Sequence, residues 1–431
     1  MYGLTIVFIL LIIVMLGKLI MKSWFNPASL LTIYWATFII FALIAFDNFE
    51  WNYIGVFWII ITCIFFGGGY ILGSSFVQKR LPDCQPVIKR NEKITGISWR
   101  IIWVIIIIGL SRTILEVVGN GFSLKMLFNI DSLININTDM AYQRYYEGGP
   151  KNNILMQIML VFVYAGPLCG GYAFNHAEKK SQLYLSFLTF VPSISSLLVT
   201  NGKAGLMASV FLWCSGFIVG YIGKYKKAPT IKLKRVIRIG VIGLLFIGLL
   251  YLSMLLRIGD FSKETRDVVS EKFEVYALGH IPAFDYWFMN YENDSSYIIG
   301  EYTFSALFDT LGLTSQQQGI FKELVYITDQ WPTNIYTVFR GLISDFGIFG
   351  GWLFSTILGL LAGILYNLLL LSRNSKSILV RVSLSMIYFS ILYSFIVSSF
   401  SYLSFILAFF VFAFYLRLSD QKQSKEKVSS I

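Results

Sequence analysis

The sequence predicts an all-α polytopic integral membrane protein with eleven or twelve transmembrane helices. Of its 431 residues, 56% are hydrophobic and only 14% are charged, which is far too apolar for a soluble domain. About eleven apolar runs are long enough to cross a bilayer core of roughly 30 Å. They lie near residues 3–20, 28–46, 52–73, 99–118, 153–174, 182–199, 204–222, 237–256, 341–371, 378–398 and 400–416. Backbone polar groups cannot stay unpaired in lipid, and no barrel-like alternation is visible, so these runs are expected to be helices.

The first run has the length of a signal-peptide core, but its basic residues, Lys18 and Lys22, follow the apolar stretch instead of preceding it. We therefore interpret it as a retained first helix. The run at 341–371 has room for a re-entrant or tilted piece, which leaves the helix count at eleven or twelve. Residues 1–431 are expected to form a single transmembrane domain. The polar tail after Arg417 is predicted to be disordered.

Three pairs of glycines stand four residues apart within the apolar runs, a spacing that allows two helices to approach closely. These pairs are Gly69/Gly73, Gly216/Gly220 and Gly359/Gly363. We expect each pair to mark a close helix contact.

The net charge of +11 is distributed unevenly over the connections between the runs. When alternate connections are assigned to opposite sides, one side collects most of the Lys and Arg residues and few of the acids. The positive-inside rule makes that side cytoplasmic, with the N-terminus outside and the C-terminus inside. The excess of Lys and Arg thus indicates the membrane topology of the chain. Nucleic acid is not expected as a partner. The most basic connection, 224–238, is expected to contact anionic membrane lipid.

Two predicted outer connections are not short, 119–151 and 257–336. The second, called the large loop below, is the only long hydrophilic stretch and lies between helices 8 and 9. Its residues Ser262–Leu278 are predicted to form an amphipathic helix, followed by a stop at Gly279 and Pro282 and a short aromatic helix at Ala283–Met289. In a protein built of spanning helices, a loop of this kind is where recognition or chemistry is expected.

Several familiar reaction types are excluded by missing motifs. The chain contains two histidines and no H-E-x-x-H, D-x-D or Walker sequence. The Asp345-Phe346-Gly347 sequence matches a kinase motif, but no other kinase element accompanies it. Any reaction is therefore expected to proceed without a metal and without a cofactor.

Cations at the predicted outer mouth of the helix bundle suggest a site for a phosphate dianion. Arg257 ends helix 8, Arg340 lies at the start of helix 9, and Lys203 occupies the turn between helices 6 and 7. Arg144 and Arg266 are weaker candidates for the same role. The alternative is that each cation is an interfacial anchor whose side chain extends to the membrane surface.

Three residues are candidates for a general base, and four are candidates for stacking on sugar rings. Asp345 and Asp285 are acids placed among aromatic residues near the membrane interface, where an unpartnered carboxylate is costly. His280 is the third candidate base, although a lone histidine after a helix is more often a packing residue. The stacking candidates are Tyr276, Tyr286, Trp287 and Tyr336. The alternative is that they are aromatic belt residues at the membrane interface.

Three segments of the chain, YALGHIPAFDYWF, GEYTFSALFDTLG and TNIYTVFRGLISDFGIFGG, resemble the large loop and following helix of the Wzy-type oligosaccharide repeat-unit polymerases. These are the O-antigen and capsule polymerases. Two positions depart from that pattern: Lys203 stands where the family often has arginine, and His280 where it often has a small polar residue. The resemblance covers the topology of the whole chain, and its specific motifs lie between about 198 and 351.

The resemblance implies a polyprenyl-pyrophosphate-dependent glycosyltransferase of the bacterial cytoplasmic (inner) membrane, acting in lipopolysaccharide or capsule biosynthesis. It would transfer a growing glycan from undecaprenyl pyrophosphate to a fresh lipid-linked repeat unit, with a chain-length regulator protein as a possible partner. Arg257, Arg340 and Lys203 would stabilise the departing pyrophosphate. Asp345, Asp285 or His280 would accept the proton of the acceptor hydroxyl. The spacing of these three does not choose among them, although Asp345 is favoured.

Two other functions are considered. An O-antigen ligase would use the same donor with a different acceptor. A polysaccharide flippase or other transporter is expected to show internal repeats, charged residues buried within helices and no large outer loop. We interpret the chain as having no internal repeats and no charged residues buried within helices, and it does have a large outer loop. This combination favours the polymerase.

Overall fold

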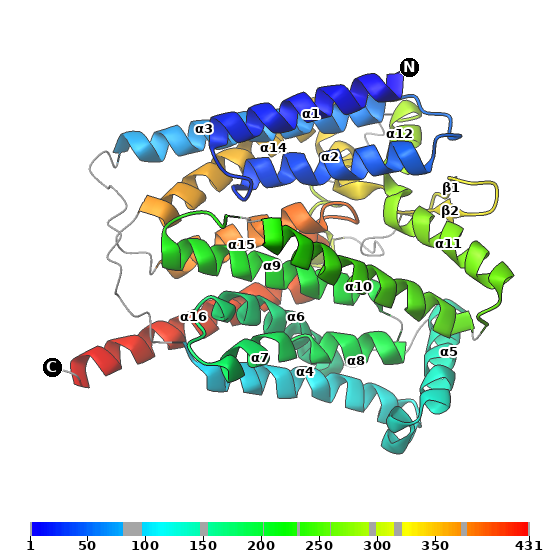
Figure 1. The fold of residues 1–431 in the computed structure, drawn as a ribbon, viewed down its shortest axis with the longest axis vertical. Coiled ribbons are helices and arrows are strands. Elements are labelled where there is room, and N and C mark those ends of the chain that lie inside the picture. The colour runs from blue at the N-terminus through cyan, green and yellow to red at the C-terminus, as the bar shows by residue number, and fades with distance from the viewer. Residues whose placement is uncertain are drawn as a thin grey trace. The chain divides into compact units, whose positions relative to one another are not determined.

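The computed structural model describes residues 2–80, 97–146, 154–200, 202–230, 233–258, 260–292, 299–313, 321–371 and 377–429. Within these ranges the chain is almost entirely helical, and its only sheet is a two-stranded antiparallel one (Figure 1). The predicted fold class, an all-α polytopic membrane protein, is confirmed.

The helices of the first half are α1 (Tyr2–Met21), α2 (Pro27–Ala45), α3 (Ile54–Arg80), α4 (Trp99–Gly119), α5 (Ile130–Tyr146), α6 (Ile154–Phe174), α7 (Lys180–Leu188), α8 (Val191–Thr200) and α9 (Lys203–Tyr225). Those of the second half are α10 (Leu233–Ile258), α11 (Lys263–Leu278), α12 (His280–Met289), α13 (Ser305–Thr310), α14 (Thr337–Leu371), α15 (Ile378–Tyr393) and α16 (Leu403–Ser429). Two 3-10 turns, η1 (Leu124–Phe128) and η2 (Ser399–Ser401), and two strands, β1 (Val325–Tyr326) and β2 (Pro332–Thr333), complete the described elements.

Nine helical segments in the described ranges are long and apolar enough to cross a membrane, and two shorter apolar helices accompany them. The shorter ones are Gly243–Leu255, within α10, and Ile378–Tyr393, which is α15. Together these segments correspond to the eleven predicted apolar runs. The run predicted at 182–199 is divided into α7 and α8, and Pro192 lies in the first turn of α8, where its missing N–H costs little.

The predicted connection 119–151 lies between α4 and α6 and contains η1 and α5. One sequence-based expectation about the chain ends is wrong. The tail after Arg417, expected to be disordered, continues α16 to Ser429, and its lysine, glutamine and glutamate residues are good helix formers.

The described chain divides into two compact units. The first comprises Met1–Ile88, Tyr225–Thr230 and Glu271–Leu403, and therefore contains α1, α2, α3, α12, α14 and α15. In this unit α3 and α14 pack along their lengths (Figure 1). A Cβ atom added at Gly69 would lie 2.1 Å from the Thr356 carbonyl oxygen, and one at Gly363 would lie 2.2 Å from that of Tyr70. Glycine is therefore required on both helices, as the predicted close contact implies.

The second unit comprises Lys89–Lys224, Ile231–Ser270 and Ser404–Ile431. Here α4 packs against α6 and α8, and α5 packs against α8. A small apolar cluster of Val117, Ile136, Met140 and Val199 joins α4, α5 and α8. The Gly216/Gly220 pair on α9 contacts α6, since a Cβ atom at Gly216 would lie 2.2 Å from the Leu168 carbonyl oxygen.

Candidate functional site

The described part of the large loop contains the helices α11, α12 and α13 and the strands β1 and β2. The amphipathic helix predicted at Ser262–Leu278 is present as α11, and the predicted stop at Gly279 separates it from α12. The aromatic helix begins at His280 instead of Ala283, because Pro282 occupies its first turn, where a proline is tolerated. In the first unit α12 packs against α2, α3 and α14.

Arg340 is a buried cation of the first unit and lies in the first turn of α14. Three aromatic rings surround its guanidinium, with the Cζ atom 4.1 Å from the ring centres of Phe321 and Tyr336 and 5.0 Å from that of Trp287. Cation–π attraction of this kind stabilises a guanidinium that has left water. Arg340 with Trp287, Phe321, Glu323 and Tyr336 is called the Arg340 site below.

One carboxylate neutralises this cation. Arg340 Nη2 donates to Glu323 Oε2 at 2.5 Å, and the Glu323 side chain is 67% exposed. Two further guanidinium nitrogens, Nε and Nη1, have no hydrogen-bond partner among the described residues. The Arg340 site therefore holds a buried guanidinium whose Nε and Nη1 can donate to an anion, whereas the Glu323 carboxylate opposes anion binding until it moves away from Nη2.

Tyr336 fixes the segment that carries Glu323. Its hydroxyl donates to the Glu323 carbonyl oxygen at 2.9 Å, and burial raises the pKa of this phenol above its usual value. The hydroxyl therefore stays protonated and keeps donating at neutral pH. Two of the four predicted stacking residues, Trp287 and Tyr336, thus contact Arg340, whereas Tyr276 and Tyr286 are about half exposed.

Asp345 lies further along α14, where its carboxylate accepts two backbone N–H groups. The donors are Tyr302, at 2.9 Å from Oδ1, and Thr303, at 2.6 Å from Oδ2. Two residues later, Gly347 breaks the helical geometry with φ 72° and ψ 176°. Asp345 therefore holds the 302–303 segment of the large loop against α14.

The Asp285 carboxylate also accepts backbone N–H groups, in this case at the start of α3. Its Oδ2 accepts from the N–H groups of Asn52 and Tyr53, and its Oδ1 accepts from that of Gly55, each at 2.9 Å. These donors surround the N-terminus of α3, so a carboxylate on α12 caps a helix more than 200 residues away in sequence. Burial raises the pKa of Asp285, and the N–H groups oppose that shift.

His280 is packed in an apolar box and is 1% exposed. Its ring lies 4.9 Å from the Phe38 ring, 5.4 Å from Phe395 and 6.2 Å from Trp35, measured between ring centres. Neither ring nitrogen has a hydrogen-bond partner among the described residues. Burial lowers the pKa of His280 to about 3, so the imidazole is neutral and a weak base.

The other predicted cations belong to the second unit. Lys203 is the first residue of α9, and Arg257 lies in the last turn of α10, both partly exposed. Arg266 is exposed on α11, and its carbonyl oxygen accepts from the Tyr251 hydroxyl. Arg144 belongs to α5, but its side chain lies outside the described residues. Of the five predicted cations, only Arg340 is in the first unit.

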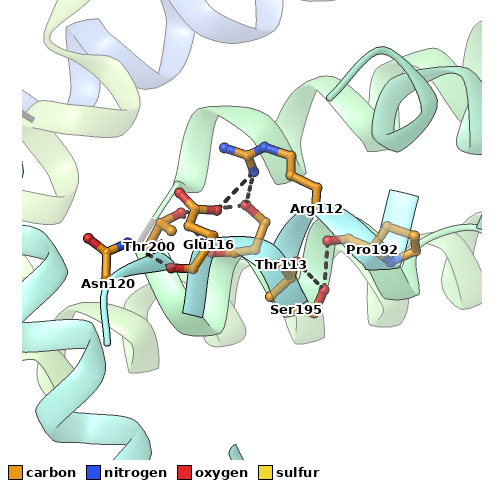
Figure 2. A network of polar contacts seen from close by, with 8 residues as sticks. Arg112, Thr113, Glu116, Asn120, Pro192, Ser195 and Thr200 are labelled. Carbon is orange, nitrogen blue, oxygen red and sulfur yellow. Dashed lines mark hydrogen bonds and ion pairs between the residues drawn. The ribbon is translucent and has the colours of Figure 1, made fainter. Parts of the chain in front are cut away.

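A polar network in the second unit was missed by sequence reasoning (Figure 2). On α4, Arg112 Nη1 lies 3.4 Å from Glu116 Oε2 and donates to the Ser196 hydroxyl on α8 at 3.0 Å. The hydroxyls of Thr113 and Ser195 also bond between these helices, at 3.0 Å. Arg112 and Glu116 are both buried within a candidate span. The expectation that charged residues are absent from the interior of the helices is therefore wrong.

The signal for this pair was present in the sequence, because opposite charges four residues apart in an apolar run face the same side of a helix. Glu323 and Phe321 gave no such signal, since they lie in an irregular segment. The described residues contain no group of three or more His, Cys, Asp or Glu side chains that could hold a metal ion.

Comparison of the chain with protein-family models, with curated proteins and with solved structures gives no match. The function is therefore argued from the geometry of the Arg340 site and from the sequence resemblance.

Proposed function

We propose that this multi-pass membrane protein polymerises lipid-linked oligosaccharide repeat units. In this proposal the growing glycan leaves undecaprenyl pyrophosphate and is joined to the non-reducing sugar of a second lipid-linked repeat unit. The reaction takes place on the outer side of the bacterial cytoplasmic membrane, with the N-terminus outside and the C-terminus in the cytoplasm. The polymer is an O-antigen or a capsular polysaccharide.

The observation that carries the proposal is the buried guanidinium of Arg340. A fixed cation with spare N–H donors suits a pyrophosphate, whose negative charge increases as the bond to the sugar breaks. Its position in the first turn of a candidate span suits a phosphate at the membrane surface. A small soluble anion would not need such a position, whereas a lipid-linked one would.

An apolar groove along α3, bordered by Thr356 of α14, supports a lipid-linked substrate. Its volume is about 480 Å³, and the lining residues come from α3 and α14. They are Ile64, Phe65, Gly68, Gly69, Ile71, Leu72 and Thr356. A groove of this composition fits a hydrocarbon chain, and α14, which packs against α3, carries Arg340.

We assign the half-exposed aromatic residues to stacking on the sugar rings of the substrate. Tyr276 on α11 and Tyr286 on α12 are about half exposed. Trp287 and Tyr336 are engaged with the guanidinium, so their proposed role is to hold the cation in place. The ligase alternative shares the donor site and differs in the acceptor.

Deletion of the gene in its host tests the proposal. A polymerase defect leaves surface glycan that carries single repeat units, whereas a ligase or flippase defect leaves bare acceptor on the same gel. Complementation with Arg340→Ala should not restore long chains, and Lys322→Ala, which removes a neighbouring exposed cation, should restore them. Bare acceptor in the deletion strain would contradict the polymerase proposal.

A further inference from the structure

We propose that Glu323 is the catalytic base of the transfer, the group that accepts the proton of the acceptor hydroxyl. The inference rests on the proposed polymerase function and adds the proton acceptor to it. Glu323 is absent from the three candidates that the sequence offers, Asp285, Asp345 and His280.

The side chain of each of those three candidates is already engaged in other contacts. Both oxygens of Asp285 accept backbone N–H groups at the start of α3, and the residue is completely buried. Both oxygens of Asp345 accept N–H groups of the large loop, and it is also buried. His280 is 1% exposed and is packed among aromatic rings. A base must come within hydrogen-bond reach of the proton that it removes, and these contacts disfavour the three positions.

Glu323 meets the geometric requirement. Its side chain is 67% exposed, while Oε2 reaches the buried guanidinium of Arg340. The backbone beneath it is held by the bond from the Tyr336 hydroxyl, so the side chain stands at a defined point on the border of the Arg340 site. An acceptor sugar that approaches a pyrophosphate on Arg340 from solvent would meet this carboxylate.

The ion pair between Glu323 and Arg340 describes the site before substrate binds. A pyrophosphate carries more negative charge than one carboxylate, so it takes over the Arg340 donors and leaves the Glu323 carboxylate free. The acceptor hydroxyl oxygen then attacks the anomeric carbon of the donor glycan. The carbon–oxygen bond to the pyrophosphate breaks, the leaving group takes the bonding electrons, and the hydroxyl proton passes to Glu323. This transfer step conserves atoms and charge, and it needs neither a metal ion nor a redox partner.

A merely structural ion pair makes a different prediction. A structural pair would hold the buried Arg340 guanidinium in place, so removal of Glu323 would lower both stability and pyrophosphate binding. A catalytic carboxylate is needed for turnover but not for anion binding, because Arg340 binds the pyrophosphate. Measurements of pyrophosphate binding and of the polymerisation rate therefore distinguish a catalytic Glu323 from a structural one.

The test uses the purified full-length protein in proteoliposomes with lipid-linked repeat units extracted from the host. Three variants are compared with the wild type: Glu323→Gln, Glu323→Asp and the control Asp329→Asn, an exposed acid on the turn between β1 and β2. We expect Glu323→Gln to lower the polymerisation rate about a hundredfold or more, Glu323→Asp to retain part of it, and Asp329→Asn to match the wild type.

The second measurement is binding of inorganic pyrophosphate to the same proteins. Glu323→Gln should bind it at least as tightly as the wild type, because the competing carboxylate is gone. Turnover of Glu323→Gln within threefold of the wild type, or pyrophosphate binding weakened more than tenfold, overturns the assignment of Glu323. A wild-type protein that forms no polymer from these substrates overturns the proposed function itself.

Discussion

Arg340 and Asp345 lie on the same turn-and-a-half of α14 but bind different segments of the large loop. Arg340 pairs with Glu323, whereas Asp345 accepts from the N–H groups of Tyr302 and Thr303. Five residues of helix correspond to a rotation of about 140° between the two side chains. The break at Gly347 comes after both, so it does not bring them to one side. The helix therefore positions a cation with one face and anchors the loop with another.

The first prediction concerns the cap that Asp285 makes on α3. Asp285→Asn should lower the stability of the protein by about 1–3 kcal/mol, because an amide offers only one acceptor oxygen to three N–H donors. Thermal unfolding in detergent, followed by intrinsic fluorescence, measures the loss. Asp309→Asn, at an exposed position on α13, is the matched control. An unchanged melting temperature for Asp285→Asn would show that the cap is dispensable.

The second prediction concerns pH. The pKa of His280 falls from its ordinary 6.5 to about 3 on folding, so the unfolded chain takes up a proton at a pH where the folded chain does not. The contribution of the neutral His280 ring to the free energy of unfolding is fully present above pH 6.5 and is lost as the pH falls toward 3. At pH 5 the loss is about 2 kcal/mol. The wild type should therefore melt at a lower temperature at pH 5 than at pH 7, and His280→Leu should show a smaller difference between the two.

Packing damage in His280→Leu acts at both pH values, so the comparison between them isolates the proton. Phe38→Leu, which alters the same apolar box and leaves the histidine in place, should keep the pH dependence of the wild type. Equal pH dependence in the wild type and in His280→Leu would contradict the assignment.

The third prediction concerns the ion pair within α4. Glu116→Leu alone should reduce the amount of folded protein, since a buried guanidinium without its partner costs about 3–5 kcal/mol. The double change Arg112→Met with Glu116→Leu should recover most of that loss, because it removes both charges and keeps the volume. Membrane accumulation and melting temperature are the measurements. A double variant that accumulates normally but makes no polymer would give the pair a role in activity rather than in packing.

The fourth prediction concerns orientation. Reporter fusions after Lys227 should indicate the cytoplasm, and fusions after Asn137 should indicate the outside, because of the uneven distribution of Lys and Arg. Paired reporters that are active on opposite sides of the membrane provide the control for each fusion. An outside signal at Lys227 would reverse the predicted topology and place the large loop in the cytoplasm.

The spanning helices were predictable from the sequence, because lipid requires a long apolar run wherever the backbone crosses it. The two helices at the start of the large loop were predictable for a similar reason, since α11 is amphipathic and Gly279 interrupts it. The close approach of α3 and α14 was visible in the spacing of Gly69 and Gly73.

The roles of the loop acids were not predictable from local pattern. Asp285 caps α3 through contacts across more than 200 residues, and no spacing rule connects Asn52 to residue 285. His280 lies among aromatic rings from α2 and from the segment after α15, which only tertiary packing brings together. Glu323 lies in an irregular segment without periodicity, so its contact with Arg340 had no signature in the sequence.

We propose that Arg340 stabilises a departing pyrophosphate, and the rate of polymer formation by the purified protein on lipid-linked repeat units tests this role. Arg340→Ala should reduce that rate about a hundredfold, the effect of losing on the order of 3 kcal/mol of transition-state stabilisation. Arg340→Lys should recover only part of it, because a point charge lacks the bidentate fork. Lys322→Ala should behave as the wild type. Undiminished polymer formation by Arg340→Ala, with release of undecaprenyl pyrophosphate at the wild-type rate, would contradict the claim.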